Sequence, residues 1–383
     1  MSCCGNSPNK HNKKNINQYN SNSINIKNYE NPPYKIYYYN ISDNNQYNYD
    51  KIENFEESTI GFYNFGNNCY MNSFLQILFH CPGFLKALKD DCGDLFDQPC
   101  LIKSLIELSK NPRNFQCLKE IKKYMSEDCS EYGSSRQNDS QDFGKDLINK
   151  IIKNIGGGLD NSFFEEESEC ETEIITPQEK IEKYIFYLKN LKSKEEKRIL
   201  VEDLFQLMES EEKISNRGAR LFFNISLYID LFFPKKQKEI YKLEDLLDFI
   251  YQNNYESNEM KENIKGIKVK RKICHLPKIL IINIERAIYG NDYELNSSIL
   301  HIPKIINLQN YIDNDLIEKK ESTNYELFAI NEKAGYYKSY GHYYCYINIK
   351  SKWHLFNDDK VYETNPNFNS EKVVGLFYIS KDN

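Results

Sequence analysis

The sequence of 383 residues lacks several features that define common classes of protein. It has no apolar stretch of about 18 residues, so a membrane-spanning helix is not expected. The first residues include no apolar segment of the kind that secretory signals carry, so no such signal is expected. There is no block of Lys and Arg, and the net charge is −6, so nucleic acid is not an expected partner.

The sequence also lacks closely spaced cysteine pairs. It has 11 cysteines, but no two of them are spaced as C-x-x-C. Neither a disulfide framework nor a cysteine-rich zinc site is therefore expected. Most of these cysteines are expected to be reduced and buried as small apolar side chains.

The expected location is cytoplasmic, with the nucleus as the alternative, and no cofactor is expected.

Residues 1–56 differ in composition from the rest of the chain. They are rich in Asn, Tyr and Lys and show little apolar periodicity, which predicts a disordered tail. Cys3 and Cys4 are candidates for acylation, but Ser2 stands where a myristoylation motif requires Gly, and membrane anchoring is not expected. Residues 57–383 are expected to form the folded domain.

The first half of this domain has apolar residues at helical spacing. This predicts one helix from Met71 that ends at Pro82, helical structure between 101 and 125, a helix that ends at Gly156, and a charged helical segment over 176–212. Asp139 or Ser140 is the expected N-cap of the third helix. Thr176 and Glu179 form a capping box that opens the fourth, with Pro177 at the first helical position.

The second half has the patterns of strands. Alternation predicts a strand over 223–231, LEDLLDFIYQ (243–252) is helical, and the apolar run KILIINIER (278–286) predicts a central strand. Further strands are expected in YELFAIN, HYYCYINI, WHLFN and VVGLFYIS. A helical first half followed by an antiparallel sheet is typical of the α+β class.

Cys69 stands where a reactive thiol is expected. It lies at the start of the first helix, directly after the turn Gly66-Asn67-Asn68. The helix dipole and unpaired N–H groups favour a thiolate there, and the same N–H groups can surround a developing oxyanion. Asn64 can fold back as a further amide donor. The alternative reading of this local pattern is a buried structural cysteine.

His342 is the best placed of the six histidines to serve as a base. It opens the strand HYYCYINI, and a turn at 348–352 would pair this strand with WHLFN. Pairing Ile347 with Trp353 puts His342 opposite Asp358 and next to Asn357. A carboxamide or carboxylate in that place can fix the imidazole tautomer. The alternative is a surface hairpin with incidental polar groups.

Taken together, these stretches resemble the ubiquitin-specific proteases, which are papain-like cysteine peptidases that release ubiquitin. GFYNFGNNCYMNSFLQ is similar to the Cys box of that family, with Asn68 in place of the usual Thr. RQNDSQDF resembles its Q-Q-D box with Asn138 replacing the second Gln, and GHYYCYI with WHLFNDDKV resembles its His box. The resemblance spans about residues 57–380. It implies a papain-like α+β fold with a helical thumb, an antiparallel-sheet palm and β fingers.

The resemblance also implies roles for individual residues. Cys69 would be the nucleophile, His342 its base, Asn357 the residue that orients the imidazole, Asp358 a residue that shares this work, and Asn64 the oxyanion-hole amide. The tail of the substrate would be bound by Gln137, Asp139, Asp142 and Gly341. Carboxylates suit that task because the tail of ubiquitin carries arginines. The segment AGYYKSYGH (334–342) would be a mobile gate.

The fingers, expected at about 160–275, depart from the family. Many members build a zinc ribbon there from two C-x-x-C pairs, whereas this chain has only Cys170 and Cys274, with His275 beside the second. The fingers are therefore expected to fold without metal. The segment 176–212 would be an insertion or a replacement.

The implied function is that of a deubiquitinase, which hydrolyses the isopeptide, thioester or peptide bond after the C-terminal glycine of ubiquitin. Its expected partners are ubiquitin and ubiquitinated proteins. One alternative is a catalytically silent ubiquitin-binding scaffold, which Asn68 and the altered fingers motivate. The other is a protease for a ubiquitin-like modifier. The sequence carries no signal for an oligomeric state.

Overall fold

The computed structural model describes residues 55–92, 100–157, 176–192, 199–215, 218–234, 238–252, 255–256, 268–288, 291–317, 322–337 and 340–381. The predicted tail up to residue 54 and Cys170 of the predicted fingers lie outside the described residues. The described chain opens with a short 3-10 helix, η3 (Phe55–Glu57). Phe55 is buried, and its ring lies 5.2 Å from that of Phe79. The fold thus begins within the segment that was predicted to be a tail.

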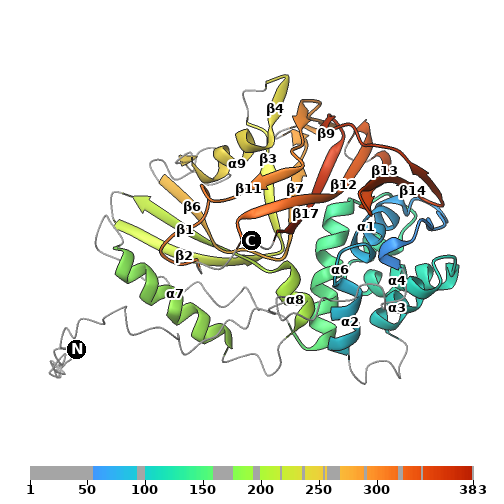
Figure 1. Ribbon diagram of the computed structural model, residues 1–383, viewed down its shortest axis with the longest axis horizontal. Coiled ribbons are helices and arrows are strands. Elements are labelled where there is room, and N and C mark those ends of the chain that lie inside the picture. Colours follow the sequence, from blue (N-terminus) through green and yellow to red (C-terminus); the bar gives the residue numbers. More distant parts are fainter. Residues whose placement is uncertain are drawn as a thin grey trace, which may run out of the picture. The chain divides into compact units, whose positions relative to one another are not determined.

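A helical part follows, as the apolar periodicity predicts (Figure 1). Its helices are α1 (Cys69–Phe79), α2 (Phe84–Cys92), α3 (Leu101–Lys110), α4 (Phe115–Asp128), α5 (Ser130–Gly133) and α6 (Ser140–Ile155). The predicted helical structure between 101 and 125 consists of two helices, because Asn114 caps the second by accepting from the N–H of Gln116 at 3.1 Å. Asp139 is the N-cap of α6, and Gly156 ends it with a φ of 94°.

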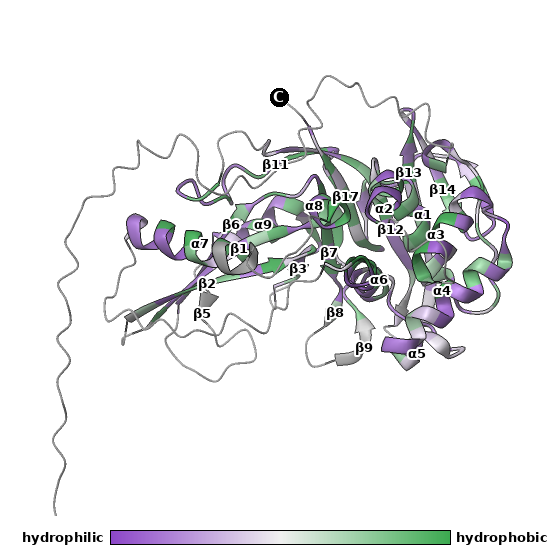
Figure 2. Ribbon diagram, turned by 90° about the horizontal axis from the view of Figure 1, so that it is seen from below, coloured by the Kyte–Doolittle hydropathy of each residue, from purple (hydrophilic) through white to green (hydrophobic). Residues whose placement is uncertain are grey.

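Helix α1 differs from the amphipathic helix that its sequence predicts, because all 11 of its residues are buried. Strand β13 (Tyr340–Ile349) and helix α6 both pack against α1. Figure 2 shows the result, with α1 and β17 (Val373–Ser380) largely in the colour of hydrophobic residues. A helix covered on every face has a rigid first turn, and Cys69 is its first residue.

The main sheet has ten strands, with the order β15-β14-β13-β12-β17-β7-β3 and the branches β11, β9 and β8. The predicted central strand is β7, which lies between β17 and β3. The α+β class is confirmed, but the pairing of β3 with β7 is parallel, so the sheet is mixed rather than antiparallel. The other bounds are β3 (Tyr228–Phe232), β7 (Ile279–Glu285), β8 (Ala287–Ile288), β9 (Asn291–Leu295), β11 (Ile305–Asn307), β12 (Asn324–Tyr337), β14 (Lys352–Asn357) and β15 (Lys360–Glu363).

A second sheet of four strands has the order β2-β1-β6-β5. Its strands are β1 (Leu207–Ser215), β2 (Gly218–Ser226), β5 (Tyr255–Glu256) and β6 (Lys268–His275). A third sheet joins β4 (Ile240–Lys242), β10 (Ile299–His301) and β16 (Asn369–Ser370). The predicted helix over 243–252 is α9 (Leu243–Tyr251).

Two predictions for this region are wrong in part. The charged segment 176–212 contains α7 (Pro177–Lys192) and α8 (Leu200–Phe205), but its last residues belong to β1. The capping box is confirmed, since the Thr176 N–H donates to Glu179 at 2.8 Å and the Glu179 N–H donates to Thr176 at 3.3 Å. The single strand predicted over 223–231 is broken at Leu227, and its two parts enter different sheets as β2 and β3.

The hairpin that carries His342 has a different register from the predicted one. Asn348, not Ile347, pairs with Trp353. The reason is a two-residue turn in which Lys350 and Ser351 have φ values of 49° and 67°. Two positive φ values are the mark of a tight turn whose twist matches the strands, and here neither residue is the Gly or Asn that usually signals it.

Arg286, which follows β7, fixes the end of this strand to three other segments. Its guanidinium is buried and donates to four backbone carbonyls, those of Val373, Asn296, Ser298 and Ser370, at distances from 2.7 to 3.1 Å. Burial lowers the pKa of this group to about 10, so it remains charged at neutral pH. One side chain thus satisfies carbonyls that would otherwise be buried without donors.

We predict that Arg286→Met lowers the free energy of unfolding by about 3–5 kcal/mol, because it leaves several buried carbonyls unpaired. Urea unfolding followed by circular dichroism measures the change. The Arg286 guanidinium also lies over the Phe233 ring, 5.1 Å from its centre. Lys304→Met is the control, because the Lys304 ammonium lies 4.9 Å from the centre of the Phe368 ring but belongs to an exposed residue. A loss for Arg286→Met no larger than that of the control contradicts this role.

Candidate active site

Cys69 lies at the buried N-terminus of α1, with a side chain that is 2% exposed. The N-cap is Asn68, whose side chain makes no capping bond to the first turn. The first N–H groups of the helix therefore stay available beside the sulfur. Together with the helix dipole, they favour negative charge at this place.

A row of polar side chains along α1 fastens the preceding segment to the helix. The row repeats every four residues and consists of Asn68, Asn72, Gln76 and His80. Each contacts a backbone carbonyl: Asn68 and Asn72 donate to Tyr63 at 3.3 and 3.2 Å, Gln76 donates to Ile60 at 3.0 Å, and His80 Nε2 lies 2.9 Å from Ser58 O. Residues 58–63 thus run antiparallel to α1, which fixes the loop that carries Asn64.

His342 on β13 contacts Cys69 and Asn357. Its Nε2 atom lies 2.7 Å from Asn357 Oδ1, so Nδ1 is the ring atom left to face the sulfur. The hydrogen bond to Cys69 is the largest cause that raises the pKa of His342 to about 9. The bond to Asn357 and the charges of Cys69 and Asp358 raise this pKa too, while partial burial lowers it. At neutral pH the imidazole is therefore protonated next to Cys69.

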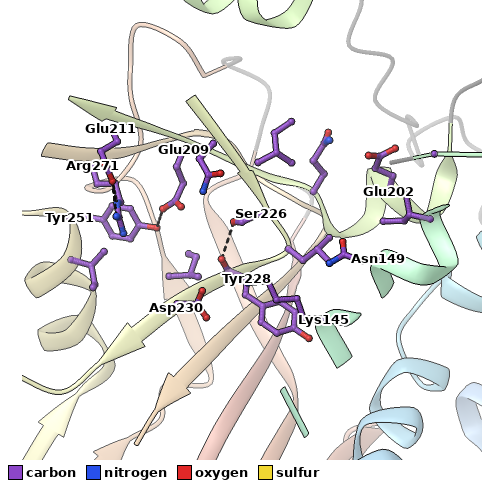
Figure 3. A pocket seen from close by; sticks show the side chains of 18 of the residues that line it. Lys145, Asn149, Glu202, Glu209, Glu211, Ser226, Tyr228, Asp230, Tyr251 and Arg271 are labelled. Atoms are coloured by element: carbon purple, nitrogen blue, oxygen red, sulfur yellow. Dashed lines mark hydrogen bonds and ion pairs between the residues drawn. The ribbon is translucent and has the colours of Figure 1, made fainter. Parts of the chain in front are cut away.

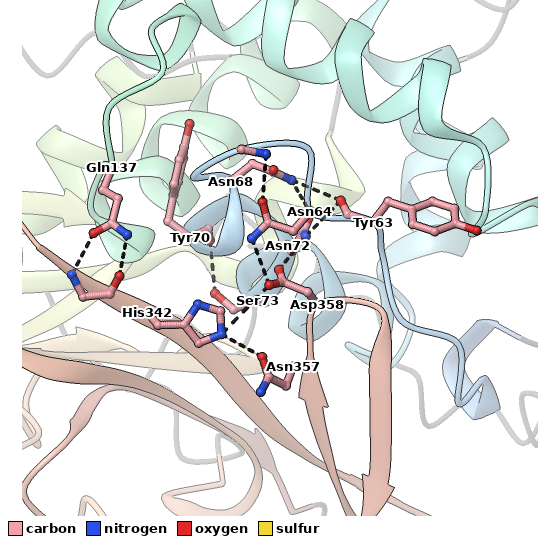
Figure 4. Close-up of polar contacts among 12 residues, drawn as sticks. Tyr63, Asn64, Asn68, Tyr70, Asn72, Ser73, Gln137, His342, Asn357 and Asp358 are labelled. Atoms are coloured by element: carbon pink, nitrogen blue, oxygen red, sulfur yellow. Dashed lines mark hydrogen bonds and ion pairs between the residues drawn. The ribbon is translucent and has the colours of Figure 1, made fainter.

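Asp358 joins the Cys69 loop to the strand pair that carries His342 (Figure 4). Its two carboxylate oxygens accept from Asn72 at 2.8 Å and from Asn64 at 2.9 Å, and one of them lies 3.9 Å from His342 Nε2. Its backbone carbonyl passes so close to Gly61 that a Cβ there would lie 2.1 Å away, which only glycine permits.

Asn64 is held at both ends of its amide. Its Nδ2 donates to Asp358, and its Oδ1 accepts from the Gly66 N–H at 3.0 Å. The second N–H of Nδ2 remains for another acceptor. The Asp358 carboxylate therefore sets the direction in which this amide can donate.

Gln137 and Asp139 bind the residues on either side of His342. Gln137 accepts from the Gly341 N–H at 2.7 Å and donates to the Gly341 carbonyl at 2.5 Å. The Tyr343 hydroxyl donates to Asp139 at 2.8 Å. Both side chains, which the resemblance assigns to substrate binding, are engaged within the protein here and fix β13 to the start of α6.

The predicted gate over 334–342 is largely strand rather than loop. Ala334 pairs with His342 and Tyr337 with Tyr340, while residues 338–339 lie outside the described residues. The two strands approach closely, and a Cβ on Gly341 would lie 2.6 Å from the Ala334 carbonyl. The Lys333 side chain also lies 3.0 Å from the same Cβ position, so Gly341 is closely packed on this side.

Asp142, in the first turn of α6, reaches solvent among other acidic groups. Desolvation is the largest cause that raises its pKa to about 6, and the carboxylates of Asp139, Glu285 and Asp146 raise it further. Lys145 and Asn149 follow on the same helix face and line a cavity of about 990 Å³ (Figure 3). This face of α6 therefore connects the cavity to the neighbourhood of Cys69.

Among the described residues, no group of three or more His, Cys, Asp or Glu side chains is placed to hold a metal ion. Cys274 is buried, and burial raises the pKa of its thiol to about 12. The eight cysteines of the described ranges are all free. Every helix in those ranges is too short or too polar to span a bilayer.

The α+β fold, in which a helix that begins with a cysteine packs against a strand that carries a histidine, is that of the papain-like class. The sequence profile of the ubiquitin carboxyl-terminal hydrolase family matches residues 60–378. The chain belongs to that family.

Individual relatives agree with this placement. The chain is 26% identical over 326 residues to ubiquitin carboxyl-terminal hydrolase Usp2 of Drosophila melanogaster, a match that covers 80% of this chain and 33% of that protein. It is 24% identical over 342 residues to ubiquitin carboxyl-terminal hydrolase 4 of Arabidopsis thaliana, which covers 80% and 85%. The chain thus spans about a third of the fly protein's length and most of the plant protein's.

Among solved structures, the SAGA Ubp8/Sgf11/Sus1/Sgf73 DUB module bound to ubiquitin aldehyde has a similar fold. The TM-score is 0.61 with 18% identity, covering 86% of this chain and 71% of that one. The same module bound to monoubiquitin gives a TM-score of 0.60 with 18% identity, covering 85% and 70%. At this identity, the likeness concerns the fold.

Sequence reasoning missed two residues that organise the site. Asn72 donates to Asp358, and Asn68 donates to Asn72 Oδ1 at 3.1 Å, which fixes the direction of the Asn72 amide. The signal was present in the spacing of four residues between polar side chains inside an otherwise apolar helix. Polar groups that repeat on one face of a buried helix must find partners.

We predict that His342 loses its proton only as the pH rises through about 9, and that Asn357→Ala lowers this pKa because it removes a bond to the ring. Nuclear magnetic resonance of ¹⁵N-labelled histidine measures both titrations. The control is Asn369→Ala, which removes an amide oxygen that lies 2.9 Å from Nδ1 of another histidine, His301, and leaves the partners of His342 in place. An unchanged His342 titration in Asn357→Ala contradicts the assignment.

Proposed function

We propose that this protein is a deubiquitinating cysteine peptidase that hydrolyses the bond after the C-terminal glycine of ubiquitin. The observation that carries the proposal is that His342, paired with Asn357 at 2.7 Å, lies on the strand that packs against the helix begun by Cys69, in a chain of the ubiquitin carboxyl-terminal hydrolase family. The Drosophila and Arabidopsis relatives are named ubiquitin carboxyl-terminal hydrolases. The SAGA module, which has a similar fold, has a structure bound to ubiquitin aldehyde.

In the first step, the Cys69 sulfur attacks the glycine carbonyl carbon and a tetrahedral oxyanion forms. The remaining N–H of Asn64 and the first N–H groups of α1 donate to this oxyanion, and one such donor typically contributes about 2.7–4 kcal/mol. The C–N bond then breaks, and the His342 imidazolium gives its proton to the leaving amine. A thioester remains between ubiquitin and Cys69.

In the second step, water attacks the thioester carbonyl, and the now neutral His342 takes a proton from it. The C–S bond breaks, so Cys69 returns to its thiolate and ubiquitin leaves with a C-terminal carboxyl group, which gives its remaining proton to solvent. Asn357 keeps the ring in the orientation that both transfers need, because its Oδ1 accepts from Nε2 throughout.

The tail of ubiquitin would reach Cys69 along the start of α6. Asp142, which is mostly ionised at neutral pH with a pKa of about 6, would pair with an arginine of the tail. One carboxylate oxygen of Asp139 accepts from the Tyr343 hydroxyl, and the other accepts from backbone N–H groups. Asp139 would therefore attract the arginine through its charge rather than bind it directly. Gly341, which has no side chain of its own, would lie beside the Gly-Gly terminus.

The body of ubiquitin would rest on the cavity beside α6. This cavity lies among α6, the four-stranded sheet, β3 and α9, and its lining includes the ion pair of Arg271 with Glu211 at 2.7 Å. In this assignment, the four-stranded sheet with α7 forms the fingers, within the predicted range 160–275. The catalytic domain, predicted over 57–383, would extend back to Phe55, and the residues before Phe55 would be its tail.

The expected partners are ubiquitin and ubiquitinated proteins. A cytoplasmic or nuclear location fits this chemistry, because thiols stay reduced in those compartments and the eight described cysteines are free. No nucleic acid or membrane is part of the proposal.

We predict that ubiquitin with a C-terminal alkyne electrophile labels Cys69, and that a panel of di-ubiquitins is cleaved by the wild type but not by Cys69→Ala. Mass spectrometry and gel assays measure the two outcomes. Cys129→Ala is the control, because Cys129 is a free, half-buried cysteine of the same helical part.

Binding of ubiquitin without labelling or turnover would instead identify a silent scaffold. Turnover of conjugates of a ubiquitin-like modifier, but not of ubiquitin, would identify a protease for that modifier. Either outcome overturns the proposal.

A further inference from the structure

A cluster of cations and aromatic rings lies next to the Cys69 loop. It consists of Tyr63, Phe65, Arg113, Phe115, Lys119 and Lys122, which we call the basic aromatic patch. Two of its rings come from the loop that precedes Cys69, and the rest comes from α4 and the turn before it. Phe115, Lys119 and Lys122 share one face of α4, since they are spaced by four and three residues.

The rings and cations of the patch contact one another. The rings of Phe65 and Phe115 meet edge to face, with centroids 5.2 Å apart. Arg113 lies 5.2 Å from the Tyr63 ring centre, Lys119 lies 4.3 Å from that of Phe115, and Lys122 lies 5.6 Å from that of Phe65. Each cation is therefore held over a ring face, which limits its motion while its charge stays exposed or half-buried.

The three cations of the patch form no ion pair within the described part of the chain. None of the ion pairs found among the described residues involves Arg113, Lys119 or Lys122, and none of these three has a further unnamed partner there. The nearby carboxylate of Glu120 is engaged by Ser104 and Gln116 at 2.9 and 3.1 Å. Tyr63 and Phe115 are 44% and 38% exposed. In a chain of net charge −6, this is a local basic surface with exposed rings.

The patch lies on one side of the nucleophile, away from the cavity. Figure 4 shows Gln137 and Tyr63 on opposite sides of the start of α1, and the Tyr63 side chain points away from His342. Gln137 binds Gly341 on the side from which α6 leads to the cavity. If ubiquitin enters from the cavity, the amine that leaves Cys69 departs toward the loop of Tyr63, Asn64 and Phe65.

We propose that the basic aromatic patch binds an acidic segment of the target protein, next to the lysine from which ubiquitin is removed. This inference rests on the proposed function and adds a substrate preference to it. Carboxylates of the segment pair with Arg113, Lys119 and Lys122, and its apolar atoms cover the exposed rings. The argument for this occupant is charge complementarity, because the patch holds three cations without paired carboxylates.

The loop links the patch to the reaction. Tyr63 and Phe65 flank Asn64, and the Phe65 N–H donates to Asn68 Oδ1 at 2.8 Å. A segment seated on these rings therefore lies within a few residues of the scissile bond. The electrostatic attraction between this segment and the basic aromatic patch depends on salt, because the Debye length falls from about 10 Å at 0.1 M to about 3 Å at 1 M.

The test uses ubiquitin joined through an isopeptide bond to the central lysine of short synthetic peptides. The flanks of the lysine are Asp and Glu in one peptide and Gln and Asn in another. We expect the wild type to cleave the acidic conjugate with a kcat/KM about 5- to 10-fold higher at low salt. The double variant Arg113→Gln, Lys119→Gln should bring this ratio close to one, as should 1 M salt.

The matched control is Lys238→Gln, Lys304→Gln. These lysines are also exposed and held over rings, 5.5 Å from that of Tyr241 and 4.9 Å from that of Phe368, but far from the Cys69 loop in sequence and outside α4. This double variant should keep the wild-type ratio. It carries the same change of net charge, so it separates local binding from long-range attraction.

Hydrolysis of ubiquitin aminocoumarin, which has no peptide flanks, separates this inference from the proposed function. No hydrolysis by the wild type would remove the proposed function itself. Hydrolysis with equal rates on the acidic and neutral conjugates would overturn the patch proposal alone, as would a preference that survives in Arg113→Gln, Lys119→Gln. Loss of binding to anionic vesicles or polynucleotides in that variant, without any peptide preference, would assign the patch to another partner.

Discussion

The packing of α1 against β13, which brings Cys69 and His342 to one place, is the interaction on which the rest of the site depends. The two residues are far apart in sequence, one at the start of a buried helix and the other on a strand of the main sheet. Their meeting requires that α1 and β13 pack in one relative position. The hydrogen bond to Cys69 is also the largest cause of the raised pKa of His342, so packing and chemistry are linked at this point.

Three sets of polar bonds maintain that position. The polar row of α1 fixes the loop before Cys69, Asp358 ties this loop to the end of β14, and Gln137 with Asp139 fixes β13 beside His342. Polar groups inside a core are costly unless they are satisfied, and satisfied ones impose a single arrangement. The site thus obtains its geometry from amides and carboxylates that sit between the helical part and the sheet.

The two sides of Cys69 have opposite electrostatic character. Asp139, Asp142 and Glu285 gather on the side of α6, whereas Arg113, Lys119 and Lys122 gather on the side of α4. A peptidase that receives a basic tail from one side and releases a lysine on the other can use such a division. In the proposed function, each side would contact its own part of a branched substrate.

Much of this could be predicted from the sequence, since α1, α6, α9, β7 and the C-terminal strands follow periodicity and capping residues that depend on neighbours in the chain. What the sequence did not predict depends on contacts between distant segments or on unusual turns. Lys350 and Ser351 give no signal for the two-residue turn that sets the His342 register. The predicted strand is broken at Leu227 because the residues before and after it join different sheets. Asn72 becomes important only because Asp358, from a distant segment, lies beside it.

The central claim concerns the proximity of a sulfur and a ring nitrogen, and chemical bridging tests it most directly. 1,3-Dibromoacetone alkylates a thiol first and then a second nucleophile within reach of its three-carbon chain. Peptide mass spectrometry should recover Cys69 joined to His342 as the main bridged product, and His342→Ala should yield no bridge to that position. Alkylation of Cys69 with no bridge to His342 in the wild type would contradict the account.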